Sequence, residues 1–255
     1  MKKEDFEAIK QFREDFFAQV QKWSKDAKNE LFELQAQASS KDTPPYPLET
    51  PVVYNTSLDE ITDSDQIKLI VIGDNPGKEE QLAKNQRYLV GQSGRVANGF
   101  FAKNPDLQID FRKNVIILNK TPVHTAKTKH LRYLIKNGSP KIKELIEQSQ
   151  IWMAEQTAKL HQSLEDCQLW LVGYSELKAN GIFTCYRDAL CNSYKTGSGF
   201  DESWQSVFAY QHFSMNCFLK DKNNFATAHP QINSLALQLK MLGTQHKDEL
   251  FTQGL

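Results

Sequence analysis

The hydrophobic positions of this chain follow two different periods, one near the start and another from residue 67 onward. Between residues 4 and 38, apolar side chains recur at steps of three and four, with charged residues between them. This spacing predicts a long amphipathic helix. Its apolar stripe consists of Phe6, Ile9, Phe12, Phe16, Val20 and Trp23. We expect the stripe to pack against the rest of the protein; a partner surface or a coiled-coil dimer is the alternative.

The segment "SSKDTPPYPLETP" then breaks the helical period with four prolines and predicts an extended connector. Beyond it, four short apolar runs alternate with longer amphipathic stretches: "IKLIVIG", "NVIILN", "CQLWLVG" and "NFATAHP". Buried strands separated by helices are typical of a parallel sheet with helices on both faces. We therefore expect an α/β fold, a three-layer α/β/α arrangement around a four-stranded parallel sheet, with a further helix over residues 232–242. Residues 1–50 form the helix and connector, and residues 51–255 form the α/β/α domain.

Composition narrows the choice of environment and cofactor. A chain of 255 residues with 40% hydrophobic residues can bury one large core. The start of the chain lacks an apolar signal segment, and no window of 18 apolar residues occurs, so the sequence predicts a cytoplasmic protein. The four cysteines include no C-x-x-C pair, which argues against a zinc or redox motif. We predict reduced thiols, no metal and no cofactor.

The predicted strands end in polar turns, and the first turn reads "GDNPGKEE". In an open parallel sheet, ligands bind at the carboxyl ends of the strands, so these turns are expected to converge on one edge. A glycine-rich turn after a strand can bind phosphate, but this one matches neither G-x-G-x-x-G nor the Walker pattern. Nucleotide binding and an ordinary turn with Pro76 and Gly77 both stay open at this point.

The pair "GDNPGKEE" and "RYLVGQSGR" resembles the first signature of the uracil-DNA glycosylase superfamily. Further along, "NVIILNKTP" resembles the second strand of that family, "LWLVGYSELKA" the third, and "FATAHP" the final strand, which delivers a histidine. The resemblance spans about residues 67–242. It implies a uracil-DNA glycosylase-like fold, a hydrolase that acts in base excision repair of DNA, and no metal or cofactor. The cysteines that the iron–sulfur branch requires are absent, so no cluster is expected.

The resemblance also implies roles for individual residues. His229 would donate a hydrogen bond to the base carbonyl as it becomes anionic. Asn75 would orient the attacking water, and Asn119 would pair with the edge of uracil. The wall of the pocket would consist of Gly73, Asp74, Pro76 and Gly77, and we group Asp74 with the catalytic residues.

At two places the sequence departs from the family pattern. Where the family has an aromatic residue that stacks on the base, this chain has the order Tyr88-Leu89. Either the aromatic residue is shifted by one position, or Leu89 supplies only an apolar wall. The apolar wedge that fills the gap left by a flipped nucleotide would have to be Ile232 or Leu235.

One segment is strongly basic although the net charge is zero. From Phe111 to Lys143 there are nine lysines and arginines and no acidic residue. Because this segment begins close to Asn119, we expect it to flank the pocket and contact DNA phosphates. The expected DNA-binding residues are Lys120, Lys127, Lys129 and Arg132. A solvated basic surface without a partner is the alternative.

Two functions from different classes follow. The first is a hydrolase that flips uracil or a related damaged base out of DNA and cleaves its N-glycosidic bond. The second is a catalytically weak or inactive protein of the same fold that binds nucleic acid or a nucleobase. Binding of a nucleotide or phosphate by "GDNPGK" is a third hypothesis.

Overall fold

A computed structural model of the chain describes residues 1–197 and 199–251. Residue 198 and residues 252–255, the last four of the predicted domain, lie outside the described residues. The fold is α/β, and its central sheet has four parallel strands in the order β2-β1-β3-β6. These strands are β1 Leu69–Gly73, β2 Val115–Asn119, β3 Gln168–Val172 and β6 Val207–Tyr210. A short antiparallel pair, β4 Lys195–Thr196 and β5 Gly199–Phe200, lies outside this sheet.

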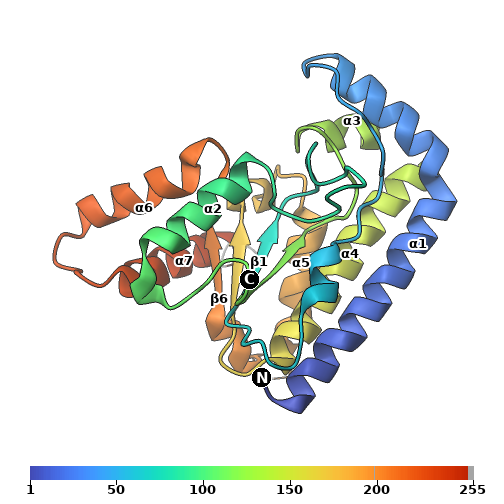
Figure 1. Ribbon diagram of the computed structural model, residues 1–255. Helices are drawn as coiled ribbons and strands as arrows, with labels where there is room; N and C mark the ends of the chain where they lie inside the picture. Colours follow the sequence, from blue (N-terminus) through green and yellow to red (C-terminus); the bar gives the residue numbers. More distant parts are fainter. Residues whose placement is uncertain (198, 252–255) are drawn as a thin grey trace.

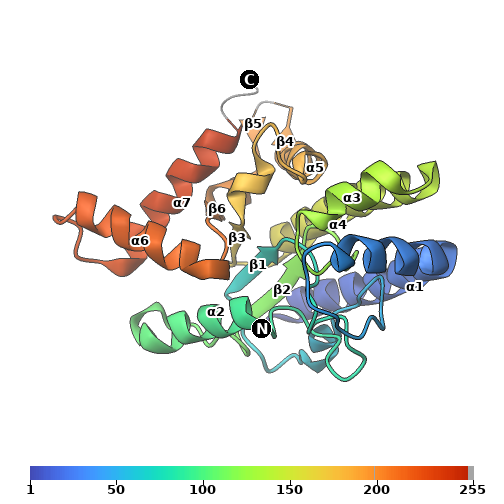
Figure 2. The same ribbon diagram turned by 90° about the horizontal axis from the view of Figure 1, so that it is seen from above.

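Helices cover both faces of the sheet (Figures 1 and 2). One group consists of α2 Gln92–Lys103, α6 Cys217–Ala228 and α7 Leu235–Phe251. The other consists of α1 Lys3–Ser40, α3 His130–Asn137, α4 Pro140–Ser163 and α5 Thr184–Tyr194. Short 3-10 turns complete the described elements: η1 Thr56–Glu60, η2 Pro105–Leu107, η3 Tyr174–Leu177, η4 Glu202–Ser206 and η5 Ser214–Asn216. The predicted helix near the end of the chain is confirmed, although α7 begins later and runs further than expected.

The long N-terminal helix packs on the main body, as its stripe predicts. The segment contains neither Gly nor Pro before Pro44, so nothing interrupts α1 until Ser40. Ile9, Phe12, Phe16, Val20 and Trp23 are buried, whereas Phe6 is only partly covered. Figure 1 shows α1 lying along α4, where the rings of Phe16 and Trp23 both contact Trp152.

The connector that follows α1 is held against the domain by side chains. Gln35 donates to the carbonyl oxygens of Pro51 and His124 at 3.0 and 2.8 Å. Gln81 accepts from the Glu49 amide at 2.6 Å and donates to the Pro47 carbonyl at 2.7 Å. The proline-rich segment therefore lies along the residues that follow the first strand, rather than acting as a free spacer.

The predicted fourth strand is wrong. "NFATAHP" is mostly helical, since residues 224–228 form the end of α6, and the fourth strand is "VFAY" instead. A short apolar run has no clear period, so the sequence pattern alone cannot distinguish a buried strand from a segment of buried helix. Phe218 and Phe225 are seven positions apart and both buried, which is helical spacing. All four residues of β6 are buried; the strand pairs with β3 and packs against α7. A run of only four residues was too short to be identified as a strand from the sequence.

Candidate functional site at the carboxyl edge of the sheet

The ends of β1 and β2 bring Gly73 and Asn119 side by side. These two residues are paired in the parallel register. A Cβ atom on Gly73 would lie 2.5 Å from Oδ1 of Asn119, so only glycine leaves room for that side chain. Asn119 is 2% exposed, and no hydrogen bond to its Nδ2 is found in the described part of the chain. A buried amide without a partner is costly, so Asn119 carries an unused donor at this edge.

Asn75 lies two residues after Gly73, and hydrogen bonds from its amide nitrogen hold its side chain in place. Nδ2 donates to Oγ1 of Thr125 at 2.9 Å, with longer contacts to the carbonyl oxygens of Val123 and Pro76. Among the described residues nothing donates to its Oδ1, which leaves that oxygen able to accept a hydrogen bond. The side chain is half-buried. Its orientation is thus determined by the segment after β2 rather than by its own turn.

A buried ion pair occupies the centre of the same edge. Lys120 is 0% exposed, and its Nζ donates to Oδ1 of Asp74 at 2.7 Å and to the Val172 carbonyl at 2.6 Å. A third contact reaches the Gly73 carbonyl at 3.3 Å. Burial lowers the pKa of Lys120, and the charge of Asp74 opposes that shift. Lys120 therefore joins the ends of three strands, and its predicted exposure to DNA is wrong because no part of it reaches solvent.

The ion pair also explains how Asp74 is accommodated. Its second oxygen accepts from Oγ1 of Thr128 at 3.3 Å, and Lys120 compensates its charge. Gly173 lies directly against this carboxylate with φ +84°, a conformation that favours glycine. Asp74 is thus a structural partner of Lys120, with its charge neutralised inside the edge.

His229 does not lie at the end of a strand. It follows α6, where its Nδ1 lies 3.0 Å from the Phe225 carbonyl and its ring stacks on Phe225 at 4.2 Å between centroids. The expected placement at the sheet edge was wrong because the segment before it is helical. Ile232 and Leu235 follow His229 and are partly buried against the core rather than projecting as wedges.

The histidine at the carboxyl edge is His212, which follows β6 and which the sequence pattern did not single out. Its Nδ1 accepts from the backbone N–H of Ser214 at 3.0 Å. Since a backbone N–H can only donate, the proton of the neutral ring is on Nε2. Burial lowers the pKa of His212, and so does Lys120, while Asp74 opposes them. The half-buried ring is therefore a neutral Nε2–H donor close to Lys120 and Asp74.

Tyr88 and Leu89 are core residues. The Tyr88 ring is fully buried, and its hydroxyl donates to the Val53 carbonyl at 2.6 Å. Leu89 is also buried, with φ +51°, and its carbonyl accepts from Arg112 at 2.5 Å. In this arrangement the Tyr88 ring has no free face to stack on a base.

Glu80 is a second residue that the sequence pattern missed. The backbone N–H of Gly77 donates to its Oε2 at 2.7 Å. Burial raises the pKa of Glu80 to about 7, and the amides of Gly77, Leu89 and Val90 pull it the other way. Pro76 is held from the opposite side, because its carbonyl accepts from Nδ1 of His124 at 2.8 Å. The Gly77 amide is therefore already occupied, which weakens the case for a phosphate cradle.

The remaining predicted DNA-binding cations are paired with carboxylates. Lys127 and Lys129 both contact Asp42, just after α1, and the Lys127 distance is 3.1 Å. Arg132 contacts Glu176 at 3.3 Å and the Asn180 carbonyl at 2.8 Å. These three side chains are exposed, but each contacts a carboxylate, and Lys127 and Lys129 share the single charge of Asp42.

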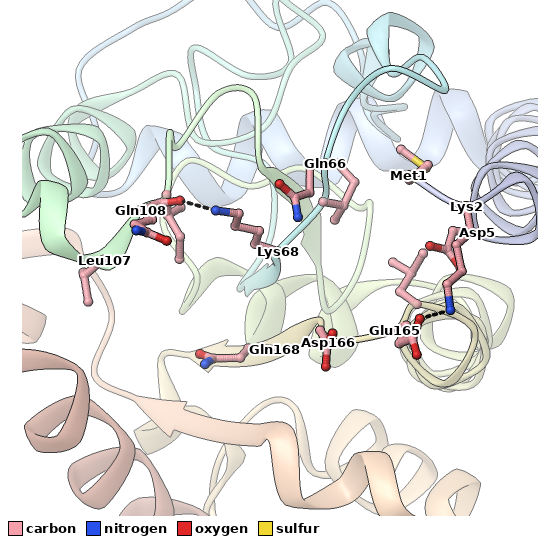
Figure 3. Close-up of a pocket in the computed structure, with 13 residues that line it drawn as sticks. Met1, Lys2, Asp5, Gln66, Lys68, Leu107, Gln108, Glu165, Asp166 and Gln168 are labelled. Atoms are coloured by element: carbon pink, nitrogen blue, oxygen red, sulfur yellow. Dashed lines mark hydrogen bonds and ion pairs between the residues drawn. The ribbon is translucent and has the colours of Figure 1, made fainter.

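The surface hollows lie away from this edge. Figure 3 shows the one at the opposite, amino-terminal edge, a cavity of about 440 Å³ between Gln66, Lys68, Gln108 and Gln168. Four further hollows elsewhere on the described residues likewise have no Asn75, Asn119 or His212 in their lining. Because Asn119 is almost fully buried, a base reaches it only if neighbouring side chains move apart.

Residues 1–197 and 199–251 contain no group of three or more His, Cys, Asp or Glu side chains placed to hold a metal ion. No helix within these ranges combines the length and apolar character that crossing a bilayer requires.

Comparison with known proteins leaves the chain unassigned to a family. No protein-family model matches it, and no curated protein is similar to it.

Proposed function

We propose that this protein is a uracil-DNA glycosylase-like hydrolase, with a fold of that type, which cleaves the N-glycosidic bond of a flipped uracil or a related damaged base. The observation that carries the proposal is that Asn75, Asn119 and His212 follow or end β1, β2 and β6 at the same carboxyl edge of the sheet, each with a hydrogen-bonding atom unused in the described residues. Three polar groups that converge at the ends of parallel strands are typical of a binding site.

The three groups match the needs of the reaction. The bond between C1′ and the base nitrogen breaks, the base takes both electrons, and a water oxygen bonds to C1′ and loses a proton to solvent. The Nε2–H of His212 is a neutral donor for the base oxygen that gains negative charge. Oδ1 of Asn75 accepts a hydrogen bond from the water and orients it, while its Nδ2 stays bound to Thr125. Asn119 offers a donor and an acceptor to the edge of uracil, where cytosine presents a different pattern.

The turn after His212 supports a further role in base flipping. Met215 is 84% exposed and, like Asn216, has a left-handed backbone, with φ values of +53° and +56°. Such strained, exposed turns are found at functional sites more often than elsewhere. Met215 replaces Ile232 and Leu235 as the apolar side chain able to enter the space of the flipped nucleotide.

The test is base release from a uracil-containing oligonucleotide under single-turnover conditions. We expect His212→Ala to lower the rate by about 10²–10³-fold, the usual cost of losing one such donor. His229→Ala is the matched control and is expected to leave the rate within about twofold, because His229 contacts only α6 and the turn after it. Equal losses from the two variants, or no release by the wild-type protein, would contradict the proposal.

The closed edge favours the second candidate, a nucleic-acid or nucleobase-binding protein without cleavage. Asn119 and Asp74 are both buried, so a base does not reach them without movement of neighbouring side chains. Salt-dependent binding of the oligonucleotide without base release would support this alternative.

A further inference from the structure

A hollow of about 300 Å³ lies between α2 and α6, which run side by side on the same face of the sheet (Figures 1 and 2). Its floor is apolar and includes Val96, Phe100 and Leu219. Three cations surround it, Arg95 and Lys103 from α2 and Lys222 from α6, and no carboxylate lines it. The hollow is therefore an apolar groove with a basic rim.

The cations of this groove differ from the three exposed cations that the sequence predicted to bind DNA. In the described part of the chain, no ion pair involves Arg95, Lys103 or Lys222, whereas Lys127, Lys129 and Arg132 are each paired with a carboxylate. Unpaired cations supply the counterion release that favours phosphate binding. The groove on α2 and α6 thus presents positive charge that no ion pair in the described residues compensates.

Gly99 keeps the groove open. It lies within α2, four residues from both Arg95 and Lys103, and so lines the same face of the helix. A Cβ atom at Gly99 would meet no atom within 4 Å. Glycine inside a helix costs about 1 kcal/mol relative to alanine. The position therefore accepts a side chain without a clash, and such a side chain would project into the groove.

The two helices of the groove both begin close to the candidate site in the chain. The α2 helix begins directly after Leu89–Gly91, and α6 begins directly after η5, which carries Met215 and starts two residues after His212. The η5 turn packs against α2. A strand that enters the site at His212 would pass along these two helices.

We infer that this groove binds a single-stranded segment of polynucleotide, with a base on the apolar floor and phosphates on Arg95, Lys103 and Lys222. An apolar surface beside a track of cations is the usual design of single-strand binding sites. The volume suits one nucleotide unit, whereas an acidic amphipathic helix needs a groove for several anchors spread over two turns. The inference rests on the proposed function for the identity of the polymer, but its test does not require base release.

The test uses a fluorescent single-stranded oligonucleotide without uracil and the full chain, with affinity measured across a range of salt concentrations. The variant carries Arg95→Gln, Lys103→Gln and Lys222→Gln; the matched control carries Lys127→Gln, Lys129→Gln and Arg132→Gln. Loss of three phosphate contacts is expected to reduce the slope of log K against log salt by about 2 in the first variant, and by much less in the control. Equal slopes for the two triple variants, or no binding by the wild type, would overturn the inference.

A second variant separates shape from charge. Gly99→Gln fills the groove without changing its charge and is expected to weaken binding several-fold, while Gly99→Ala keeps most of it. Unfolding curves of both variants show whether α2 remains folded. Full affinity in folded Gly99→Gln would contradict the inference, and tighter binding of an acidic peptide than of the oligonucleotide by the wild type would assign the groove to a protein partner instead.

Discussion

Lys120 illustrates how the neighbours of a single residue decide its role. In the sequence it belongs to a run of cations beside a predicted pocket, which is a typical DNA-binding pattern. In the structure it is enclosed between Asp74, Val172 and the ring of Phe183. The reverse holds for His212, which has no obvious motif in the sequence but presents a donor at the edge of the sheet. The difference between Lys120 and His212 is how each side chain is buried, and residue type predicts burial only as a statistical tendency.

The ion pair gives a prediction about stability. Lys120→Met leaves Asp74 buried without its cation and is expected to lower the free energy of unfolding by about 3–5 kcal/mol. Adding Asp74→Asn removes the unpaired charge and is expected to recover much of that loss. Urea denaturation of the single and double variants measures both effects, with Lys129→Met as a surface control that changes stability by less than about 1 kcal/mol. A double variant no more stable than Lys120→Met would show that the pair is not coupled.

At the scale of elements, the site depends on links between segments that are distant in the chain. Glu80 joins the turn after β1 to the segment before α2, and His124 joins the same turn to the connector through the Tyr46 hydroxyl at 2.9 Å. Strands β1, β2 and β3 were predictable because each contains a continuous run of four apolar residues, which is consistent with a buried strand. β6 contains a run of the same length, but such a run by itself does not distinguish a strand from part of a buried helix.

Glu80 makes the stability of this link depend on pH. Its pKa is raised to about 7 in the folded protein from an ordinary value of 4.5, so between these values the folded state binds more protons than the unfolded state. The contribution of Glu80 therefore decreases as pH rises from 4.5 to 7, by about 3 kcal/mol in total. Glu80→Gln does not titrate, and the difference in unfolding free energy between it and the wild type is expected to change by that amount across the window. A constant difference would contradict the assignment.

At the scale of the whole molecule, the net charge is zero, so any nucleic-acid partner has to be attracted by local surfaces. Part of the positive charge is offset by carboxylates, inside the fold by Asp74 and at the surface by Asp42 and Glu176. The packing of α1 and the connector around the domain also buries titratable groups. Both effects depend on which distant segments meet, so neither is visible in a charge count.

Two buried histidines predict loss of stability in acid. Burial lowers the pKa of His124 and of His161 to about 4 from an ordinary 6.5. Each therefore stabilises the fold above pH 6.5 and loses that contribution as pH falls toward 4, about 3 kcal/mol apiece. The opposite trend of Glu80 offsets only part of this. Urea midpoints measured from pH 7 to 4.5 are expected to fall, less steeply in His124→Gln and His161→Gln; an unchanged slope in both variants would contradict the prediction.

The sequence by itself determined the elements whose signal is local. The 3.6-residue stripe of α1, the apolar runs of β1 to β3, and the turn "GDNPG" at the end of β1 depend on neighbours a few positions away. Only the tertiary structure decided which side chains meet at the edge of the sheet. It brought His212 there in place of His229, enclosed Lys120, paired Lys127 and Lys129 with Asp42, and left the cations of α2 and α6 free. The physical reason is that burial and charge pairing arise from contacts between segments far apart in the chain, and periodicity carries no information about those contacts.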